Sequence, residues 1–127
     1  TDEEIESYGL LCVPKNTRKN GQWAKNAFTL WAAERNLKRA EKKLEAMQII
    51  PDKPLELLTN EELNYALPRF ISEVRKSDGT YYPPNSLWQL IMGVQIYMGM
   101  NGGRPMRLLN DPNFTQVKNA LDYTMKD

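Results

Sequence analysis

The chain has 127 residues, of which 26% are charged and 41% hydrophobic, and its formal net charge is +1. This length is typical of one domain, which can bury a core without a metal or disulfide staple. The single cysteine excludes an internal disulfide, the absence of histidine excludes the common zinc sites and histidine-activated nucleophiles, and no apolar run reaches the ~20 residues of a membrane span.

The charges are unevenly distributed along the chain. Residues 1–14 hold four acids and no base, whereas residues 15–43 hold nine bases and two acids. We therefore expect two parts, an acidic N-terminal lead over residues 1–14 and a helical domain over residues 15–127. A basic block of this kind is typical of a phosphate-binding surface, although many solvated helix faces share it.

The first predicted helix runs from about Thr17 to about Met47, and a break near Asn36 is left open. Asn16 or Thr17 is expected to cap its N-terminus by accepting a hydrogen bond from a backbone N–H group. Its apolar stripe recurs at helical spacing and consists of Trp23, Ala27, Phe28, Leu30 and Trp31.

The second predicted helix begins at Thr59, after a segment whose two prolines cannot continue a helix. Thr59 and Glu62 fit a capping box, and Pro68 inside the helix is expected to remove a hydrogen bond and bend the axis. The helix should end at the turn Ser77-Asp78-Gly79, where glycine can take a positive φ. Its expected buried face consists of Leu63, Leu67, Phe70, Ile71 and Val74.

The third predicted helix has Pro84 at its first position and ends at Asn101-Gly102-Gly103. Gly93 in its middle predicts the close approach of another helix. Trp88 lies off the apolar stripe, and we expect it to be buried in the bundle rather than exposed for stacking. The expected buried face consists of Leu87, Leu90, Ile91, Val94, Tyr97 and Met98.

The fourth predicted helix is capped by Asp111, with Pro112 at the first position. Its stripe consists of Phe114, Val117, Leu121 and Met125. No alternating β-branched run of useful length appears, so the sequence predicts an all-α fold, a four-helix orthogonal bundle.

No group of residues predicts an active site. The acidic pair Glu61 and Glu62 lies at a helix N-terminus, where carboxylates favour the helix dipole. The segment Asn101-Gly102-Gly103-Arg104 lacks the preceding strand and the following Lys-Ser/Thr of a phosphate loop. We therefore expect a protein that is not an enzyme, with no catalytic residue, metal, cofactor, small-molecule substrate or membrane partner.

Two of the predicted helices carry side chains suited to DNA, because cations hold phosphates and amides pair with base edges. The first offers Lys15, Arg18, Lys19, Gln22, Lys25 and Asn26. The third opens, at its positive end, with Tyr82, Asn85, Ser86 and Gln89. From the residues alone, a solvated polar face explains the first group equally well. A capped helix, with Tyr82 packed on Pro83 or Pro84, explains the second group slightly better.

Three segments together resemble a known family, and in chain order they read WAKNAFTLWAAERN, LNYALPRFISEVRKSDGTYYPPNSLWQLIMGVQIYM and FTQVKNALDYTMKD. They resemble the opening helix, central block and closing helix of the crypton-derived tyrosine-recombinase-like domain of MYM-type zinc-finger proteins and their glutamine-rich relatives. The resemblance covers roughly residues 14 to 126. It implies the SAM-like, N-terminal core-binding domain of a tyrosine recombinase without the catalytic domain.

The resemblance further implies that the first and third helices face DNA, which favours DNA binding for Lys19, Gln22, Lys25, Asn26, Ser86 and Gln89. The expected partner is double-stranded DNA, with chromatin or transcription regulatory proteins beside it, in a nuclear regulator derived from a transposon. The chain departs from the family at Pro68, where a helix former is usual, and at Ile96, where a basic residue is common. The rival interpretation is a protein-interaction scaffold that has lost DNA binding and uses exposed Trp88, Ile96 and Met100.

Overall fold

The computed structural model describes residues 15–43, 48–103 and 107–124. The acidic lead and the predicted positions Met47, Arg104 and Met125 lie outside these ranges. The elements in chain order are α2 (Lys15–Glu41), η1 (Leu55–Leu57), α3 (Asn60–Glu73), α4 (Pro84–Asn101), η2 (Pro112–Phe114) and α5 (Thr115–Thr124). Within the described ranges the only extended pairing is an isolated bridge between Arg75 and Tyr81, so the all-α prediction is confirmed.

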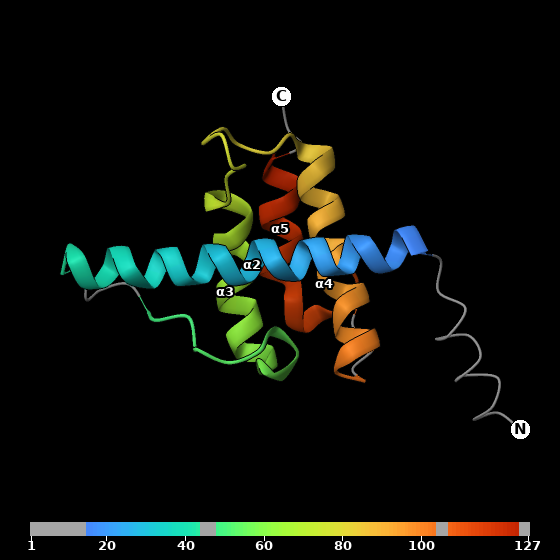
Figure 1. Cartoon of the computed structure of the whole chain (residues 1–127). Helices are drawn as coiled ribbons and strands as arrows, with labels where there is room; N and C mark the ends of the chain where they lie inside the picture. The colour runs from blue at the N-terminus through green and yellow to red at the C-terminus, as the bar shows by residue number, and fades with distance from the viewer. Residues whose placement is uncertain (1–14, 44–47, 104–106, 125–127) are drawn as a thin grey trace, which may run out of the picture.

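The long helix α2 lies across α3, α4 and α5, which stand side by side behind it (Figure 1). The core lies between these two layers and is built from large apolar side chains that are almost completely buried, among them Phe70, Leu90, Ile91, Met98 and Phe114. This arrangement agrees with the predicted bundle of four crossing helices. It leaves the outer face of α2 uncovered along the whole described molecule.

Helix α2 begins at Lys15 and continues without a break to Glu41. The prediction that Asn16 or Thr17 caps the helix is therefore wrong, because both residues already lie inside it. Its buried residues follow helical spacing and are Gly21, Ala24, Phe28, Trp31 and Arg35. Leu30, which the sequence placed in the apolar stripe, lies beside this row and is 62% exposed.

The crossing of α2 over α4 depends on two glycines that face each other across the contact. A Cβ atom on Gly93 would lie 2.6 Å from the Cβ of Ala24 and 2.7 Å from the carbonyl oxygen of Asn20. A Cβ atom on Gly21 would lie 3.3 Å from a methyl group of Ile96. The prediction that Gly93 marks a close helix crossing is confirmed.

Helix α3 begins with the predicted capping box. The backbone N–H of Glu62 donates to Thr59 Oγ1 (3.1 Å), and the backbone N–H of Thr59 donates to Glu62 Oε1 (2.8 Å). Lys53 Nζ donates to the same carboxylate (2.8 Å), and this bond, followed by the bond from the Thr59 N–H, lowers the pKa of Glu62. Pro68 lies inside the helix.

The end of α3 differs from the prediction. The helix stops at Glu73, because the chain turns extended at Val74 (φ −63°, ψ 138°) and Arg75 then pairs with Tyr81. The residues 77–79 form the tip of the resulting loop rather than a helix end, with Gly79 at φ 88°. The positive φ was therefore predicted at the right residue, but the helix ends one turn earlier.

Helix α4 has Pro84 at its first position, and every residue of its predicted face is buried. Trp88 is 44% exposed, so its predicted burial is wrong. The reason is that Leu87, Leu90 and Ile91 already fill the side of α4 that faces the core, and Trp88 points away from it. Asp111 accepts a hydrogen bond from the Asn113 N–H (2.9 Å) and caps η2, which leads into α5.

Candidate nucleic-acid interface

The first group of candidate residues lies on the N-terminal half of α2, and we call it the α2 polar face. Five of its six side chains are exposed and Lys25 is half-buried; the members are Lys15, Arg18, Lys19, Gln22, Lys25 and Asn26. The Gln22 amide donates to Asn26 Oδ1 (3.0 Å), which orders the two amides along the helix surface. The face therefore combines several cations with an ordered pair of hydrogen-bonding amides.

A shallow hollow of about 320 Å³ lies where the first turns of α2 pass beside the C-terminal end of α4. Lys15, Arg18 and Lys19 line it from α2, and Tyr97 and Asn101 line it from α4. Three cations around a hollow suit a phosphate oxygen. Burial, followed by the nearby Glu56 carboxylate, raises the pKa of Tyr97, so its hydroxyl keeps its proton through the neutral range.

The second group of candidate residues lies at the first turns of α4, next to α2. Asn85 and Gln89 are exposed, while Ser86 and Tyr82 are half-buried. Tyr82 does not rest on the neighbouring prolines alone, because its ring meets the ring of Trp23 edge to face with 6.0 Å between centroids. The helix has no side-chain cap at Pro83. Pro84 has no N–H group and the Ser86 N–H donates to the Pro83 carbonyl (3.0 Å), so an anion at this positive helix end would meet the Asn85 N–H.

The two groups lie on opposite flanks of α2. On one flank Asn20 Nδ2 donates to the Gln89 carbonyl (3.2 Å) and Trp23 meets Tyr82, which joins α2 to the first turns of α4. On the other flank Lys15, Arg18 and Lys19 adjoin the last turn of α4. Gln22 and Asn26 span the surface between them. The structure thus brings both groups to one helix, but it separates them by the width of that helix.

A larger groove, of about 930 Å³, lies between α2 and the segment 74–82, and we call it the basic groove. Its cations are Arg35, Lys38, Lys42, Arg75 and Lys76. Sequence reasoning missed this groove because Arg75 and Lys76 come from a loop far along the chain. A signal was present nevertheless, since Leu30, Glu34 and Lys38 recur every four residues on one side of α2 and Lys42 follows at the same spacing just after its end.

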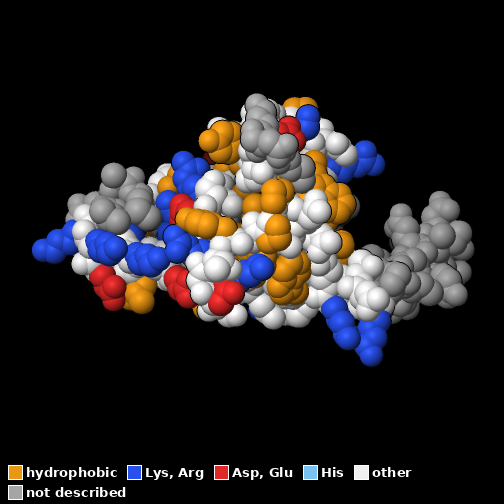
Figure 2. Space-filling model, turned by 90° about the horizontal axis from the view of Figure 1, so that it is seen from above, with side chains coloured by type: hydrophobic (Ala, Val, Ile, Leu, Met, Phe, Trp, Pro, Cys, Tyr) orange, Lys and Arg blue, Asp and Glu red, His pale blue; other side chains and the backbone are white. Residues whose placement is uncertain are grey.

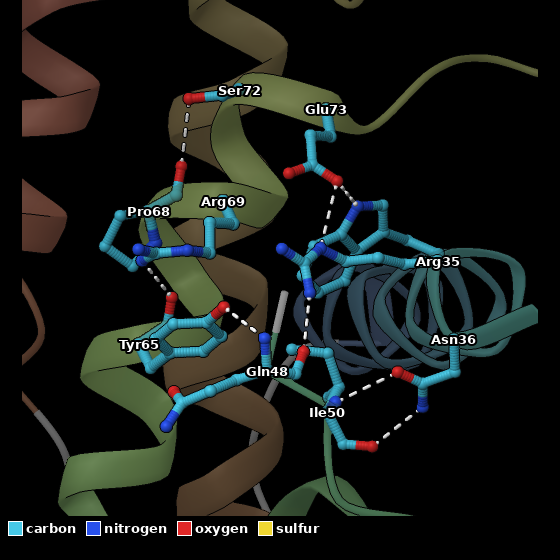
Figure 3. A network of polar contacts seen from close by, with 10 residues as sticks. Arg35, Asn36, Gln48, Ile50, Tyr65, Pro68, Arg69, Ser72 and Glu73 are labelled. Atoms are coloured by element: carbon cyan, nitrogen blue, oxygen red, sulfur yellow. Dashed lines mark hydrogen bonds and ion pairs between the residues drawn. The ribbon is translucent and has the colours of Figure 1, made fainter. Parts of the chain in front are cut away.

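A network of polar side chains fixes the inner wall of the basic groove (Figure 3). Arg35 is only 7% exposed; its Nε donates to Glu73 Oε1 (3.2 Å) and its Nη1 donates to the Gln48 carbonyl (2.8 Å). Trp31 Nε1 donates to the same Glu73 oxygen (3.3 Å). Because Arg35 and Trp31 come from α2 and Glu73 ends α3, these bonds hold the two helices at a fixed separation.

The same network ties the segment before η1 to the two helices. The Asn36 amide both donates to the Ile50 carbonyl (2.8 Å) and accepts from the Ile50 N–H (3.0 Å). The Gln48 N–H donates to the Tyr65 hydroxyl (3.1 Å), and Arg69 stacks over the Tyr65 ring at 3.8 Å. Burial raises the pKa of the Tyr65 hydroxyl. The hydrogen bond from the Gln48 N–H and the positive charges of Arg35 and Arg69 outweigh burial, so the net effect is a lowered pKa.

The described part of the chain holds no group of three or more His, Cys, Asp or Glu side chains that could bind a metal ion. In the same residues, no helix has the length and apolar character needed to cross a membrane.

The model of the QRICH1 domain family matches residues 18–127. Zinc finger MYM-type protein 3 of mouse and of human is 26% identical over an alignment of 129 residues, which covers 97% of this chain and 9% of each relative. Human Zinc finger MYM-type protein 2 is 31% identical over 68 residues, or 54% of this chain and 5% of the relative.

The chain therefore spans less than a tenth of the length of these curated relatives. No solved structure matches. The predicted kinship with MYM-type zinc-finger proteins and their glutamine-rich relatives is confirmed, and the chain belongs to the QRICH1 domain family.

Proposed function

We propose that this chain is a non-catalytic DNA-binding module of a nuclear regulatory protein, and that it binds duplex DNA with the α2 polar face and the first turns of α4. One observation carries the proposal. Cations and ordered amides run along the uncovered half of α2, and the open N-terminal end of α4 lies beside them. The relatives bear the name of zinc-finger proteins, which agrees with a regulatory role.

The placement of the two groups on opposite flanks of α2 suits a helix that enters the major groove. An α-helix with side chains is about 10–12 Å wide, and the major groove of B-DNA is about 12 Å wide. In this pose Gln22 and Asn26 face base edges, Lys15 and Lys19 face the phosphates of one strand, and Ser86 and Gln89 face the other strand. Phosphate contacts then position the helix, and the two amides read the bases.

The proposal includes a recombinase-like ancestry. The resemblance to the core-binding domain of tyrosine recombinases assigns DNA contact to the same two helices, and it supports a transposon-derived module that has kept binding without strand cleavage. Nuclear location, and chromatin or transcription regulatory proteins as additional partners, belong to the same proposal.

A titration of the chain with duplex DNA at several salt concentrations tests the proposal. If four to six phosphates are engaged, log affinity falls against log salt with a slope of about −4 to −5. Lys19→Ala should make the slope shallower by about 0.9, because one phosphate contact is lost. Lys118→Ala is the charge-matched control, since Lys118 is exposed on α5 behind α2 (Figure 1). Absence of binding at low salt would overturn the proposal.

A protein-interaction scaffold is the second candidate function, and the exposure of Trp88 favours it. The other two residues of that interpretation fit less well, because Ile96 and Met100 are half-buried and Ile96 lies against α2 near Gly21. The variant Trp88→Ser separates the candidates: unchanged DNA affinity together with loss of a protein partner would assign Trp88 to the scaffold.

A further inference from the structure

The basic groove has an apolar floor that water reaches. Trp23, Ala27, Leu30 and Tyr82 line it at the end nearer to α4, and Leu30 is among the most exposed large apolar side chains in the described part of the chain. Covering such a side chain with apolar surface gains about 25 cal/mol for each Å² removed from water. The floor therefore favours a ligand that brings an apolar side chain of its own.

The other end of the basic groove is cationic. Arg35 and Glu73 neutralise each other in an ion pair of 3.2 Å, which leaves Lys38, Lys42, Arg75 and Lys76 against a single carboxylate, Glu34. Figure 2 shows this side of the molecule. Lys and Arg side chains lie along the C-terminal half of α2, on the left of the view, and hydrophobic side chains lie beside them near the middle of the molecule. The groove thus has an excess of positive charge beside its apolar floor.

We propose that the basic groove binds a short segment of a partner protein in which acidic residues accompany large apolar ones. Apolar side chains of the segment would cover Leu30 and Ala27, and its carboxylates would lie against Lys38, Lys42 and Lys76. Duplex DNA fits less well, because phosphates gain nothing from covering the exposed Leu30 side chain, whereas an apolar side chain of a peptide does. The groove shares Asn26 and Tyr82 with the residues proposed for DNA binding, but the side chains proposed to hold the peptide (Leu30, Ala27, Lys38, Lys42 and Lys76) are not among those residues.

The dimensions of the groove set the length of the segment. From Trp23 to Lys42 the axis of α2 advances about 28 Å at 1.5 Å per residue. An extended peptide covers this distance with about nine residues. The walls are preformed, since the Arg35 and Trp31 bonds to Glu73 hold one side and the Arg75–Tyr81 bridge closes the loop on the other. A preformed groove lowers the ordering cost of binding.

Fluorescence anisotropy with a synthetic peptide tests the inference. The probe is a fluorescein-labelled peptide of about nine residues in which Leu and Phe alternate with Glu and Asp. We expect saturable binding by the whole chain, and a loss of about tenfold or more for Leu30→Ser and for Lys38→Glu. Both residues are exposed, so neither change disturbs the core, and thermal unfolding of each variant verifies that it folds.

Matched controls use residues of the same kind outside the groove. Leu37 is an equally exposed leucine of α2 (59%, against 62% for Leu30), and it does not line the groove. Leu37→Ser and Lys118→Glu should therefore leave peptide affinity unchanged. Peptides with Gln and Asn in place of the acids, or with Ser in place of Leu and Phe, should each bind more weakly than the probe.

Three results would overturn the inference: no binding of the probe, an equal loss for Leu37→Ser and Leu30→Ser, or competition by duplex DNA that depends on Leu30 and Lys38. The last result would make the groove a nucleic-acid surface instead. Lys19→Ala distinguishes this inference from the proposed function, because it should weaken DNA binding and leave the peptide affinity unchanged. Failure of DNA binding therefore leaves the peptide result interpretable on its own.

Discussion

At the scale of single residues, Gly93 decides how closely α2 and α4 approach. The space that a methyl group would need is already taken by the Cβ of Ala24 and the carbonyl oxygen of Asn20, and the carbonyl belongs to rigid helical backbone. Gly93→Ala should lower the free energy of unfolding by about 1–3 kcal/mol, the usual cost of overpacking a core. Chemical denaturation monitored by circular dichroism measures the change.

Gly99 provides the matched control, since it lies in the same helix and a Cβ atom there would meet nothing within 4 Å. Gly99→Ala should leave stability unchanged or raise it by up to about 1 kcal/mol, because alanine is the better helix former. Equal effects at the two positions would contradict the assignment of Gly93 to the crossing.

At the scale of the elements, local chemistry determined which helix boundaries the sequence could predict. The cap of α3 and the proline at the start of α4 were predicted correctly because neighbouring residues alone build them. The end of α3 was not, because the pairing of Arg75 with Tyr81 spans six residues and competes with the helix. The burial of Leu30 was predicted wrongly for a similar reason. Leu30 does lie in the predicted helix, but the packing of α3 and α4 against α2 determines which side of that helix is buried.

The cap of α3 makes a prediction about pH. The folded-state pKa of Glu62 lies below the ordinary glutamate pKa of 4.5, mainly because Lys53 donates a hydrogen bond to its carboxylate. The resulting stabilisation is fully present above the unfolded pKa and is lost as the pH falls through the folded pKa. Glu62→Gln should therefore cost about 0.2–1 kcal/mol at neutral pH, as measured by urea denaturation.

The same comparison below pH 4.5 should show a smaller difference, because acid removes the charge that the substitution removes. The variant Lys53→Gln serves as control, and combining it with Glu62→Gln should add little to either single change at neutral pH. A difference between wild type and Glu62→Gln that stays constant with pH would show that the charge of Glu62 does not contribute.

At the scale of the whole molecule, the sequence predicted the four helices and the family, but it predicted only one of the two candidate binding surfaces. The candidate residues of α2 were recognised from their own charges, and those of α4 from their place at a helix start. The basic groove joins Lys38 and Lys42 to Arg75 and Lys76, and nothing local links these pairs. Only the crosswise placement of α2 in Figure 1 brings them together.

The predicted domain boundary at residue 15 can be tested on the stability of the whole fold. The part of α2 that enters the core begins at Gly21 and Ala24, and the first turn from Lys15 is mostly exposed. If the predicted boundary is right, a chain that starts at Lys15 should have a free energy of unfolding within about 0.5 kcal/mol of that of the full chain. Thermal and urea denaturation of both chains provide the comparison.

A chain that starts at Lys25 is the contrasting truncation, because it loses both Gly21 and Ala24 from the crossing with α4. Since α4 would then expose the surface around Gly93, the free energy of unfolding of this chain should fall by about 2 kcal/mol or more. Its unfolding transition should also extend over a broader range of denaturant concentration. If removal of residues 1–14 alone destabilised the protein by as much, the acidic lead would belong to the folded domain and the boundary at residue 15 would be wrong.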